Sequence, residues 1–120
     1  MISRMSDIQC LFCRIARDEI PARKVFEDEY VVAFHDVNPQ APTHVLVIPR
    51  RHVATLDELT EADANAIGMT VVRIGQIATS LQLPSDGYRV VVNTGAAAGQ
   101  TVFHIHFHLL GGRELGWPPG

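Results

Sequence analysis

Short runs of apolar residues, many of them β-branched or aromatic, recur along the chain and predict β-strands. They cover residues 24–27, 30–34, 44–48, 88–93 and 102–110. The first two runs are separated by two acidic residues and are expected to form a hairpin, and Pro49 ends the third run. The pattern therefore predicts a sheet of five strands.

One segment has a helical period instead. Beyond Thr60, apolar residues recur at steps of four and three, which predicts an amphipathic helix over about residues 61–81. The stripe expected to face the sheet consists of Ile67, Val71, Ile74, Ala78 and Leu81. Thr60 and Asp63 have the spacing of a capping box at the helix start, and Thr55 and Glu58 have the same spacing just before it.

The long helix carries more apolar surface than one sheet face needs. Met69, Val72 and Ile77 lie outside the predicted stripe, and Gly68 and Gly75 leave room for another backbone to approach. We therefore expect a homodimer with this helix in the interface.

A shorter helix of about two turns is predicted over residues 10–17, because Pro21 disfavours the helical conformation at Ile20. Two helices and five strands with mostly hairpin-length connections indicate an antiparallel sheet of the α+β class. The 120 residues are enough for a single domain, residues 1–120, of which about 1–6 are expected to be disordered.

Charge and hydropathy exclude several classes of partner. Ten Lys and Arg against thirteen Asp and Glu give a formal net charge of −3, and the basic residues are scattered except for Arg50-Arg51. Nucleic acid is therefore not an expected partner. The chain has no apolar run long enough for a signal peptide or a membrane span, so we expect a cytoplasmic protein without membrane association.

Three of the six histidines lie within five residues near the C-terminus. His104, His106 and His108 alternate with bulky apolar residues, so a strand would place all three imidazoles on one face. Their ordinary pKa is about 6.5, and three close imidazoles cannot all be charged, which leaves roles as acceptors, nucleophiles or metal ligands. There are two alternative interpretations of the three histidines: they form a solvated polar face without chemistry, or all three bind one catalytic zinc ion.

The loop before these histidines, residues 93–101, has almost no side chains until Gln100. Its backbone N–H groups are expected to be accessible to an oxyanion such as phosphate, with Asn93 and Thr101 adding donors at its two ends. A plain loop joining two strands is the alternative.

The only cysteines, Cys10 and Cys13, have C-x-x-C spacing. In a reducing compartment this spacing indicates metal binding or redox chemistry before a structural disulfide. No βαβ pattern of the thioredoxin type surrounds the pair, which disfavours a redox role. Two reduced thiols packed against the sheet are the remaining alternative.

The run His104-Ile105-His106-Phe107-His108-Leu109-Leu110 is the signature of the histidine-triad family, and Gly99-Gln100-Thr101-Val102-Phe103 precedes it as in that family. The chain resembles the Hint branch, the histidine-triad nucleotide-binding proteins, from about Asp7 to Gly120. The matching segments are Glu19-Ile20-Pro21-Ala22, Ala33-Phe34-His35-Asp36, Ala41-Pro42-Thr43-His44, Leu46-Val47-Ile48-Pro49, Arg89-Val90-Val91-Val92-Asn93 and Trp117-Pro118-Pro119-Gly120. The last of these favours Hint over the fragile-histidine-triad branch, whose members hydrolyse dinucleoside polyphosphates.

The resemblance implies a homodimer with a ten-stranded sheet and a site for a purine nucleoside monophosphate. Asp36 would bind the ribose hydroxyls, and the base and ribose pocket would consist of Phe12, Ile20, Phe34, His35, Val37 and Leu46. The α-phosphate would be surrounded by Asn93, Gly99, Gln100, Thr101, His106 and His108. An Asx-turn is the alternative for Asp36, because Asn38-Pro39 follows. The catalytic set would be His106, His108, His104, His44 and Thr101.

Two features depart from much of the Hint branch. Thr101 replaces the serine of that branch; its hydroxyl still donates, but its methyl group crowds the leaving group. The cysteine pair resembles bacterial histidine-triad proteins in which two cysteines and two histidines bind structural zinc, and the matching residues are Cys10, Cys13, His52 and His104. Such a closed tetrahedral site has no open position for catalysis.

The expected function is hydrolysis of a purine nucleoside 5′-phosphoramidate, or a related nucleotide conjugate, through a covalent intermediate on His106. No metal is required for that chemistry, since a neutral imidazole attacks phosphorus and backbone donors stabilise the charge. The alternatives are cleavage of dinucleoside polyphosphates and a nucleotide-sensing or scaffold role with incidental hydrolysis.

Overall fold

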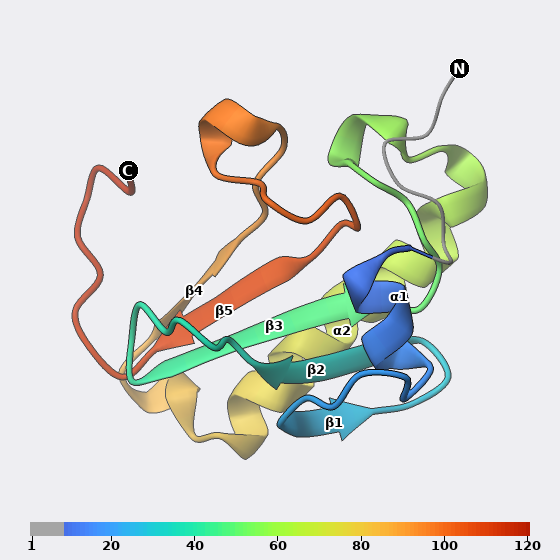
Figure 1. Ribbon diagram of the computed structural model, residues 1–120. Coiled ribbons are helices and arrows are strands. Elements are labelled where there is room, and N and C mark those ends of the chain that lie inside the picture. The colour runs from blue at the N-terminus through green and yellow to red at the C-terminus, as the bar shows by residue number, and fades with distance from the viewer. Residues whose placement is uncertain (1–8) are drawn as a thin grey trace.

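The structure, a computed structural model, describes residues 9–120, and the expected disorder of residues 1–6 lies outside that range (Figure 1). One antiparallel sheet contains all five strands in the order β1-β2-β3-β5-β4. The strands are β1 (Lys24–Glu27), β2 (Val31–His35), β3 (Thr43–Pro49), β4 (Tyr88–Val91) and β5 (Phe107–Gly111). The predicted α+β class and five-stranded sheet are confirmed.

The two central strands β2 and β3 are buried on both faces, because a helix covers each side of the sheet (Figure 1). Alternate residues of β2 enter two separate cores. Val31 and Ala33 pack with the long helix α2 (Ala64–Ser80), whereas Val32 and Phe34 pack with the short helix α1 (Leu11–Ala16). The α1 side of the sheet also carries the histidines of interest.

Helix α1 begins where the sequence predicted it. Cys10 is its N-cap, and the Cys13 N–H group donates to the Cys10 sulfur at 3.4 Å. Phe12 and Ile15 turn their side chains into the core below the helix. The local sequence therefore places both cysteines at the first turn of a short helix that lies directly on the sheet.

The long helix confirms its predicted position but corrects its predicted stripe. A 3₁₀ turn, Glu61–Asp63, leads into α2, and the Asp63 carboxylate accepts a hydrogen bond from the Thr60 N–H group at 2.9 Å, as the capping box predicted. Ile77, predicted outside the stripe, is buried, whereas Val71, predicted inside it, is 54% exposed. The buried face consists of Thr70, Ile74, Ile77 and Ala78.

The second predicted capping box, at Thr55 and Glu58, is not formed. Residues Leu56–Glu58 form a 3₁₀ turn without a side-chain cap, and the buried Thr55 hydroxyl accepts and donates no hydrogen bond among the described residues. Two further 3₁₀ turns, Leu83–Ser85 and Ala96–Ala98, precede and follow β4. Between residues 9 and 120, none of the helices is long and apolar enough to cross a membrane.

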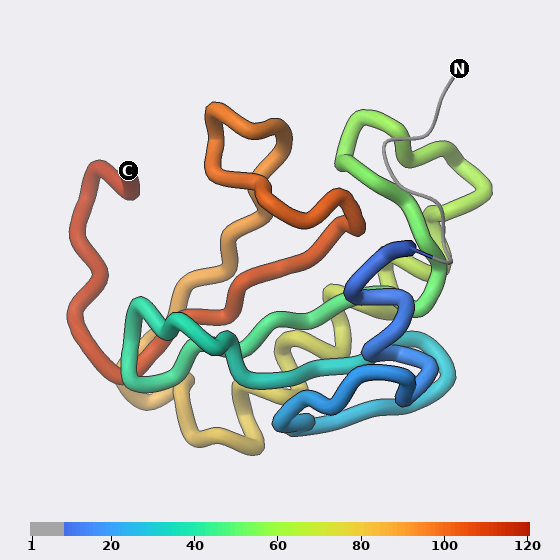
Figure 2. Tube along the Cα trace, viewed as in Figure 1, coloured from blue at the N-terminus to red at the C-terminus, as the bar shows by residue number. Residues whose placement is uncertain are grey.

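The predicted histidine strand is shorter than expected. Strand β5 begins at Phe107, so His108 lies in the sheet, whereas His104 lies in a bend and His106 in the irregular segment between that bend and the strand. The chain leaves the sheet there because the Ile105 N–H group donates to the Val53 carbonyl at 2.7 Å. Figure 2 shows the loop between β4 and β5 rising above the sheet, opposite the segment that follows β3.

Candidate active site

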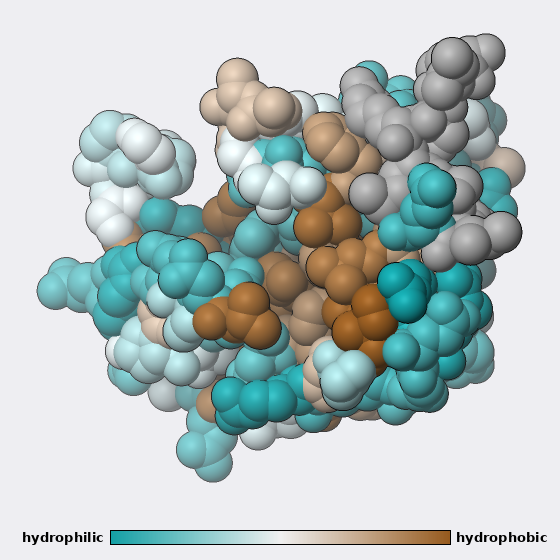
Figure 3. All heavy atoms as spheres, in the orientation of Figure 1, coloured by the Kyte–Doolittle hydropathy of each residue, from teal (hydrophilic) through white to brown (hydrophobic). Residues whose placement is uncertain are grey.

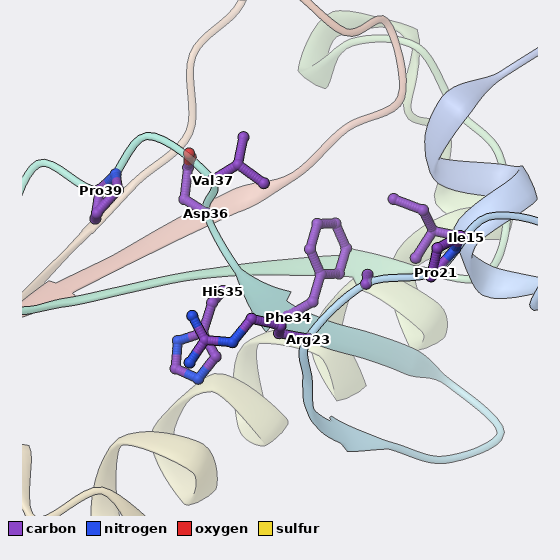
Figure 4. Close-up of a pocket in the computed structure, with 9 residues that line it drawn as sticks. Ile15, Pro21, Arg23, Phe34, His35, Asp36, Val37 and Pro39 are labelled. Atoms are coloured by element: carbon purple, nitrogen blue, oxygen red, sulfur yellow. The ribbon is translucent and has the colours of Figure 1, made fainter.

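A cavity of about 250 Å³ lies between α1, the end of β2 and the loop before β5. Hydrophobic residues gather in the hollow at the centre of this face (Figure 3). The residues that line the cavity are Leu11, Phe12, Ile15, Phe34, His35, Asp36, Val37, Leu46, Gly99, Thr101, Val102, His106 and His108. A neighbouring cavity of about 370 Å³ shares five of these residues and extends the hollow toward Pro21, Ala22, Arg23 and Pro39 (Figure 4).

Most of the predicted base pocket is brought together here. Phe12 and Phe34 meet edge to face with their ring centroids 5.5 Å apart, and Leu46 lies beside them in the same core. Val37 stands at the mouth and is fully exposed, as expected of an apolar wall that a ligand would cover. The pocket is therefore apolar on its floor and open on one side.

Two members of the predicted base pocket are placed differently. Ile20 lines neither cavity and packs against the core under α1 instead, because it follows the helix end and turns inward. His35 lines both cavities, but its side chain points away from that of Phe34, since successive residues of a strand face opposite sides (Figure 4).

Sequence reasoning missed several lining residues, namely Leu11, Ile15, Pro21, Ala22, Arg23, Pro39 and Val102. A signal was present for two of them, because Leu11 and Ile15 are four residues apart on the predicted short helix and therefore share a face. The others lie in loops, where no periodicity indicates direction.

His106 is held in one orientation at the back of the cavity. Its Nδ1–H group donates to the His104 carbonyl at 2.7 Å, and the Phe12 ring stands edge-on to it at 5.0 Å between centroids. With the proton on Nδ1, the lone pair of a neutral imidazole is on Nε2. Burial lowers the pKa of His106, against the opposing effects of the His104 carbonyl and Asp36. His106 is therefore neutral at pH 7 with a nucleophilic Nε2.

His44 and His108 form a hydrogen-bonded pair, and the backbone N–H group of Gln40 determines the tautomer of each ring. The Gln40 N–H group donates to His44 Nδ1 at 3.0 Å, so the His44 proton is on Nε2. That Nε2–H group lies 2.9 Å from His108 Nδ1 and donates to it. His108 consequently carries its own proton on Nε2. Burial lowers the pKa of His44, and burial with the neighbouring His106 and His44 lowers that of His108 to about 4.

The triad histidines differ in depth. His104 is fully buried and His106 is 7% exposed, whereas His108 is partly exposed. The reason is tertiary: His106 and His104 lie against Phe12 of α1, while His108 pairs with Leu46 on the open part of the sheet.

Asp36 makes the Asx-turn that was the alternative to a ribose contact. Its Oδ1 accepts from the Asn38 N–H group at 2.8 Å, and its Oδ2 lies 3.4 Å from His44 Nε2. Asp36, His44 and His108 also have the donor types of a metal site. A metal on His44 Nε2 would displace its proton, and His44 Nδ1 already accepts from Gln40, so hydrogen bonding describes this cluster better.

The loop over residues 93–101 is less open than predicted. The N–H groups of Ala98, Gly99 and Gln100 donate to carbonyls of the same 3₁₀ turn, and hydrogen bonds also occupy the Gln100 side chain. Its Oε1 accepts from Gly95, and its Nε2 donates to the Ala54 and Val102 carbonyls. The Gln100 side chain therefore holds the loop in place, and Gln100 does not line the cavity.

The end of this segment does line the cavity. Gly99, Thr101 and Val102 are among the lining residues, and no hydrogen bond is formed by the Thr101 and Val102 N–H groups in the part of the chain that the structure describes. The Asn93 amide nitrogen lies close to Gly99. The N–H groups left for a ligand are therefore at the end of the loop and not in its middle.

Beside the cavity, the four residues predicted to bind zinc converge. His104 Nδ1 lies 3.4 Å from both the Cys10 and Cys13 sulfurs and 3.1 Å from His52 Nδ1, and Cys13 Sγ lies 3.3 Å from His52 Nδ1. Neither cysteine is in a disulfide, and both are buried. His104 Nε2–H donates to the Pro49 carbonyl at 2.7 Å, which directs the Nδ1 lone pair to the cluster. Two soft sulfurs and two imidazoles suit tetrahedral zinc.

A single metal site built from all three triad histidines is not formed. His104 belongs to the cysteine cluster and His108 to the cluster with Asp36, and His106 belongs to neither potential metal cluster found over residues 9–120. The triad is therefore divided between the cysteine cluster, which includes His104, and the cavity, which His106 and His108 line.

The HIT domain family model matches residues 17–115. The chain is 43% identical to the purine nucleoside phosphoramidase of Escherichia coli, covering 90% of this chain and 91% of that protein, and 42% identical to the 14 kDa zinc-binding protein of Zea mays, covering 99% and 94%. A HIT family hydrolase from Legionella pneumophila superimposes with a TM-score of 0.91 at 48% identity over 93% of this chain and all of that one. The triad, the cavity and these similarities show that the chain belongs to the HIT domain family.

Proposed function

We propose that the protein hydrolyses the P–N bond of purine nucleoside 5′-phosphoramidates and releases the nucleoside monophosphate. One observation carries the proposal. His106 donates from Nδ1 to a backbone carbonyl, so its unprotonated Nε2 is available in a cavity lined by aromatic residues, Asp36 and the end of the loop before β5. The similarity to a phosphoramidase supports the choice of substrate.

In the first step, His106 Nε2 attacks phosphorus while the P–N bond breaks. The leaving amine takes up one proton, which the Thr101 hydroxyl passes on from solvent while it is itself reprotonated, and His108 stays neutral. In the second step, a water oxygen bonds to phosphorus as the bond to Nε2 breaks, and the proton that the water loses returns to solvent by the same route. The His104 carbonyl continues to hold Nδ1–H throughout, which stabilises the positive charge of the phosphorylated imidazole.

Charge on the phosphoryl oxygens meets donors that are already in place. Thr101 and Val102 line one wall, and their N–H groups would donate to the phosphoryl oxygens; His108 would offer Nε2–H from the sheet because His44 occupies its Nδ1. Such donors need no reorganisation during the reaction and supply the main electrostatic stabilisation. His44 thus contributes by holding His108 in the donating tautomer.

The nucleoside is held by the apolar hollow and one carboxylate. The base would stack between Phe12, Phe34 and Val37, and Asp36 would accept hydrogen bonds from the ribose hydroxyls with the lone pairs that Asn38 leaves unused. The Asx-turn and the ribose contact are therefore compatible, since the turn fixes the direction of the carboxylate.

We further propose one zinc ion per chain, held by Cys10, Cys13, His52 and His104. When bound, it would cross-link α1 to the segments before β5 and after β3. The four protein ligands leave no open position, so the metal takes no part in bond breaking. Elemental analysis of protein purified without added metal should find about one equivalent, and less than about a tenth with reduced thiols would reject the site.

We also propose a homodimer in the cytoplasm. The outer face of α2 exposes Val71 and Val72, and open space lies over Gly68 and Gly75, so a second copy can approach closely. Strand β4 is an edge of the sheet and could be continued by its counterpart into ten strands. Two free thiols are in keeping with a reducing compartment.

The decisive experiment compares wild type and His106→Ala on an adenosine phosphoramidate. Turnover should fall by several orders of magnitude, whereas nucleoside monophosphate affinity should stay within about tenfold because Asp36 and the aromatic pocket remain. Rapid quench should trap label on His106. Label on His104 or His108, or more than about one per cent residual activity, would reject the mechanism.

Two controls separate the alternatives. Faster turnover of a dinucleoside polyphosphate than of the phosphoramidate would assign the protein to the other branch of the family. A cellular effect that survives His106→Ala would identify a sensing or scaffold role.

A further inference from the structure

His104 belongs to two sites at once. Its imidazole Nδ1 faces the two cysteine sulfurs and His52, and its backbone carbonyl accepts the Nδ1–H group of His106 at 2.7 Å. Its remaining ring nitrogen donates to the Pro49 carbonyl. The ring and the carbonyl belong to the same residue, so a contact that restrains the His104 ring also restrains the carbonyl to which His106 is hydrogen-bonded.

A second connection runs through α1. Cys10 and Cys13 flank Phe12 in the first turn of this helix, and the Phe12 ring stands edge-on to both His104 and His106, with interplanar angles of 69° and 88°. The His106 ring is thus contacted by Phe12, which lies between the two cysteines, and is hydrogen-bonded to the carbonyl of His104. Both contacts depend on residues of the cysteine and histidine cluster or on their neighbour in the chain.

We propose that the metal cluster is a positioning device for the nucleophile, in which Cys10, Cys13, His52 and His104 together set the direction of His106 Nε2. This inference rests on the function proposed above. The ligand cluster would then take no part in bond breaking but would still set the rate of the first chemical step, through the orientation of His106.

Hydrogen bonding alone does not give the same rigidity. Without a metal, thiols and imidazoles at 3.1 to 3.4 Å are joined only by weak sulfur contacts and by shared protons. The hydrogen bond from the His104 ring to the Pro49 carbonyl and these weak contacts would restrain the direction of the ring less than a bond to a metal ion. Residues that orient a reacting group in this way typically change activity by about 10 to 100-fold, and a displacement of about 1 Å is sufficient for the larger effect.

The test uses His52, which is the least buried of the four ligands and does not line the cavity. His52→Ala removes one ligand, and His52→Cys is the matched control because a Cys₃His set also binds zinc. Each full-length variant is analysed for metal content, turnover of the phosphoramidate, nucleoside monophosphate affinity and the ¹⁵N shifts of the His106 ring.

We expect His52→Ala to lose the metal, to lower kcat by about tenfold or more, and to leave nucleoside monophosphate affinity within about threefold. The ¹⁵N shifts should show that His106 no longer keeps its proton on Nδ1 alone. His52→Cys should retain the metal, the turnover and the His106 tautomer. Metal-free His52→Ala with unchanged kcat and unchanged His106 shifts would overturn the proposal.

A second measurement covers the case in which His52→Ala does not fold. Zinc is titrated into chelator-treated wild type, and the His106 ring signals should change in step with the first equivalent; unchanged signals would reject the coupling. This readout is independent of hydrolysis. A wild type that binds zinc and orders His106 but does not cleave phosphoramidates would refute the proposed function and leave the coupling intact.

Discussion

Acidification should destabilise the folded protein through His108. Burial and the neighbouring His106 and His44 lower the pKa of His108 to about 4, whereas an unfolded histidine titrates near 6.5. Above pH 6.5 the imidazole is neutral in both states, and the full stability is present. As the pH falls from 6.5 toward 4, the unfolded chain binds the proton and the folded protein does not, so stability is lost over this range.

The size of the effect follows from the two pKa values. The difference corresponds to at most about 3 kcal/mol, and solvent screening of a partly exposed imidazole reduces this to about 1 to 2 kcal/mol. Urea unfolding at several pH values between about 4.5 and 7.5 should be compared for wild type and His108→Gln. Both proteins have the same cysteine cluster, so its own acid sensitivity cancels in the difference.

Between about pH 7.5 and 4.5, the free energy of unfolding of wild type should fall by about 1 to 2 kcal/mol more than that of His108→Gln. Parallel curves for the two proteins would refute the reasoning, because His108 would then have the same proton affinity in the folded and unfolded states. A His108 pKa above 6 in a direct NMR titration would refute it independently.

Asp36→Asn should weaken nucleoside monophosphate binding by about tenfold or more, because hydrogen bonds to a charged group are lost, and calorimetry with the 2′,3′-dideoxy analogue should show no such difference. Gln100→Met should lower the free energy of unfolding by about 2 kcal/mol, since three hydrogen bonds that hold the loop disappear; an unchanged urea midpoint would contradict this. Wild type should sediment as a dimer at micromolar concentration and Val72→Asp as a monomer, and a monomeric wild type would exclude the α2 interface.

The sequence by itself determined the elements and their class. Short β-branched runs, a proline after α1 and a long segment with helical period are local signals, and local backbone preferences produced strands and helices near the expected positions. Alternation along the triad also predicted one face for His106 and His108, and both line the cavity, whereas His104 has the same parity but lies in a bend and belongs to the cysteine cluster. The C-x-x-C spacing indicated a metal cluster because it brings both cysteines into the first turn of one helix.

Only the tertiary structure decided the roles within the triad. His44 and His108 are 64 residues apart, and their contact exists because β3 and β5 are paired in one register. Cys10 and His104 meet across 94 residues because α1 lies on the sheet beside the bend that precedes β5. Gln100 turned inward because the Ala54 carbonyl came within its reach. Depth, tautomer and free donors depend on such partners, and no periodicity in a single sequence specifies which partner a polar side chain will find.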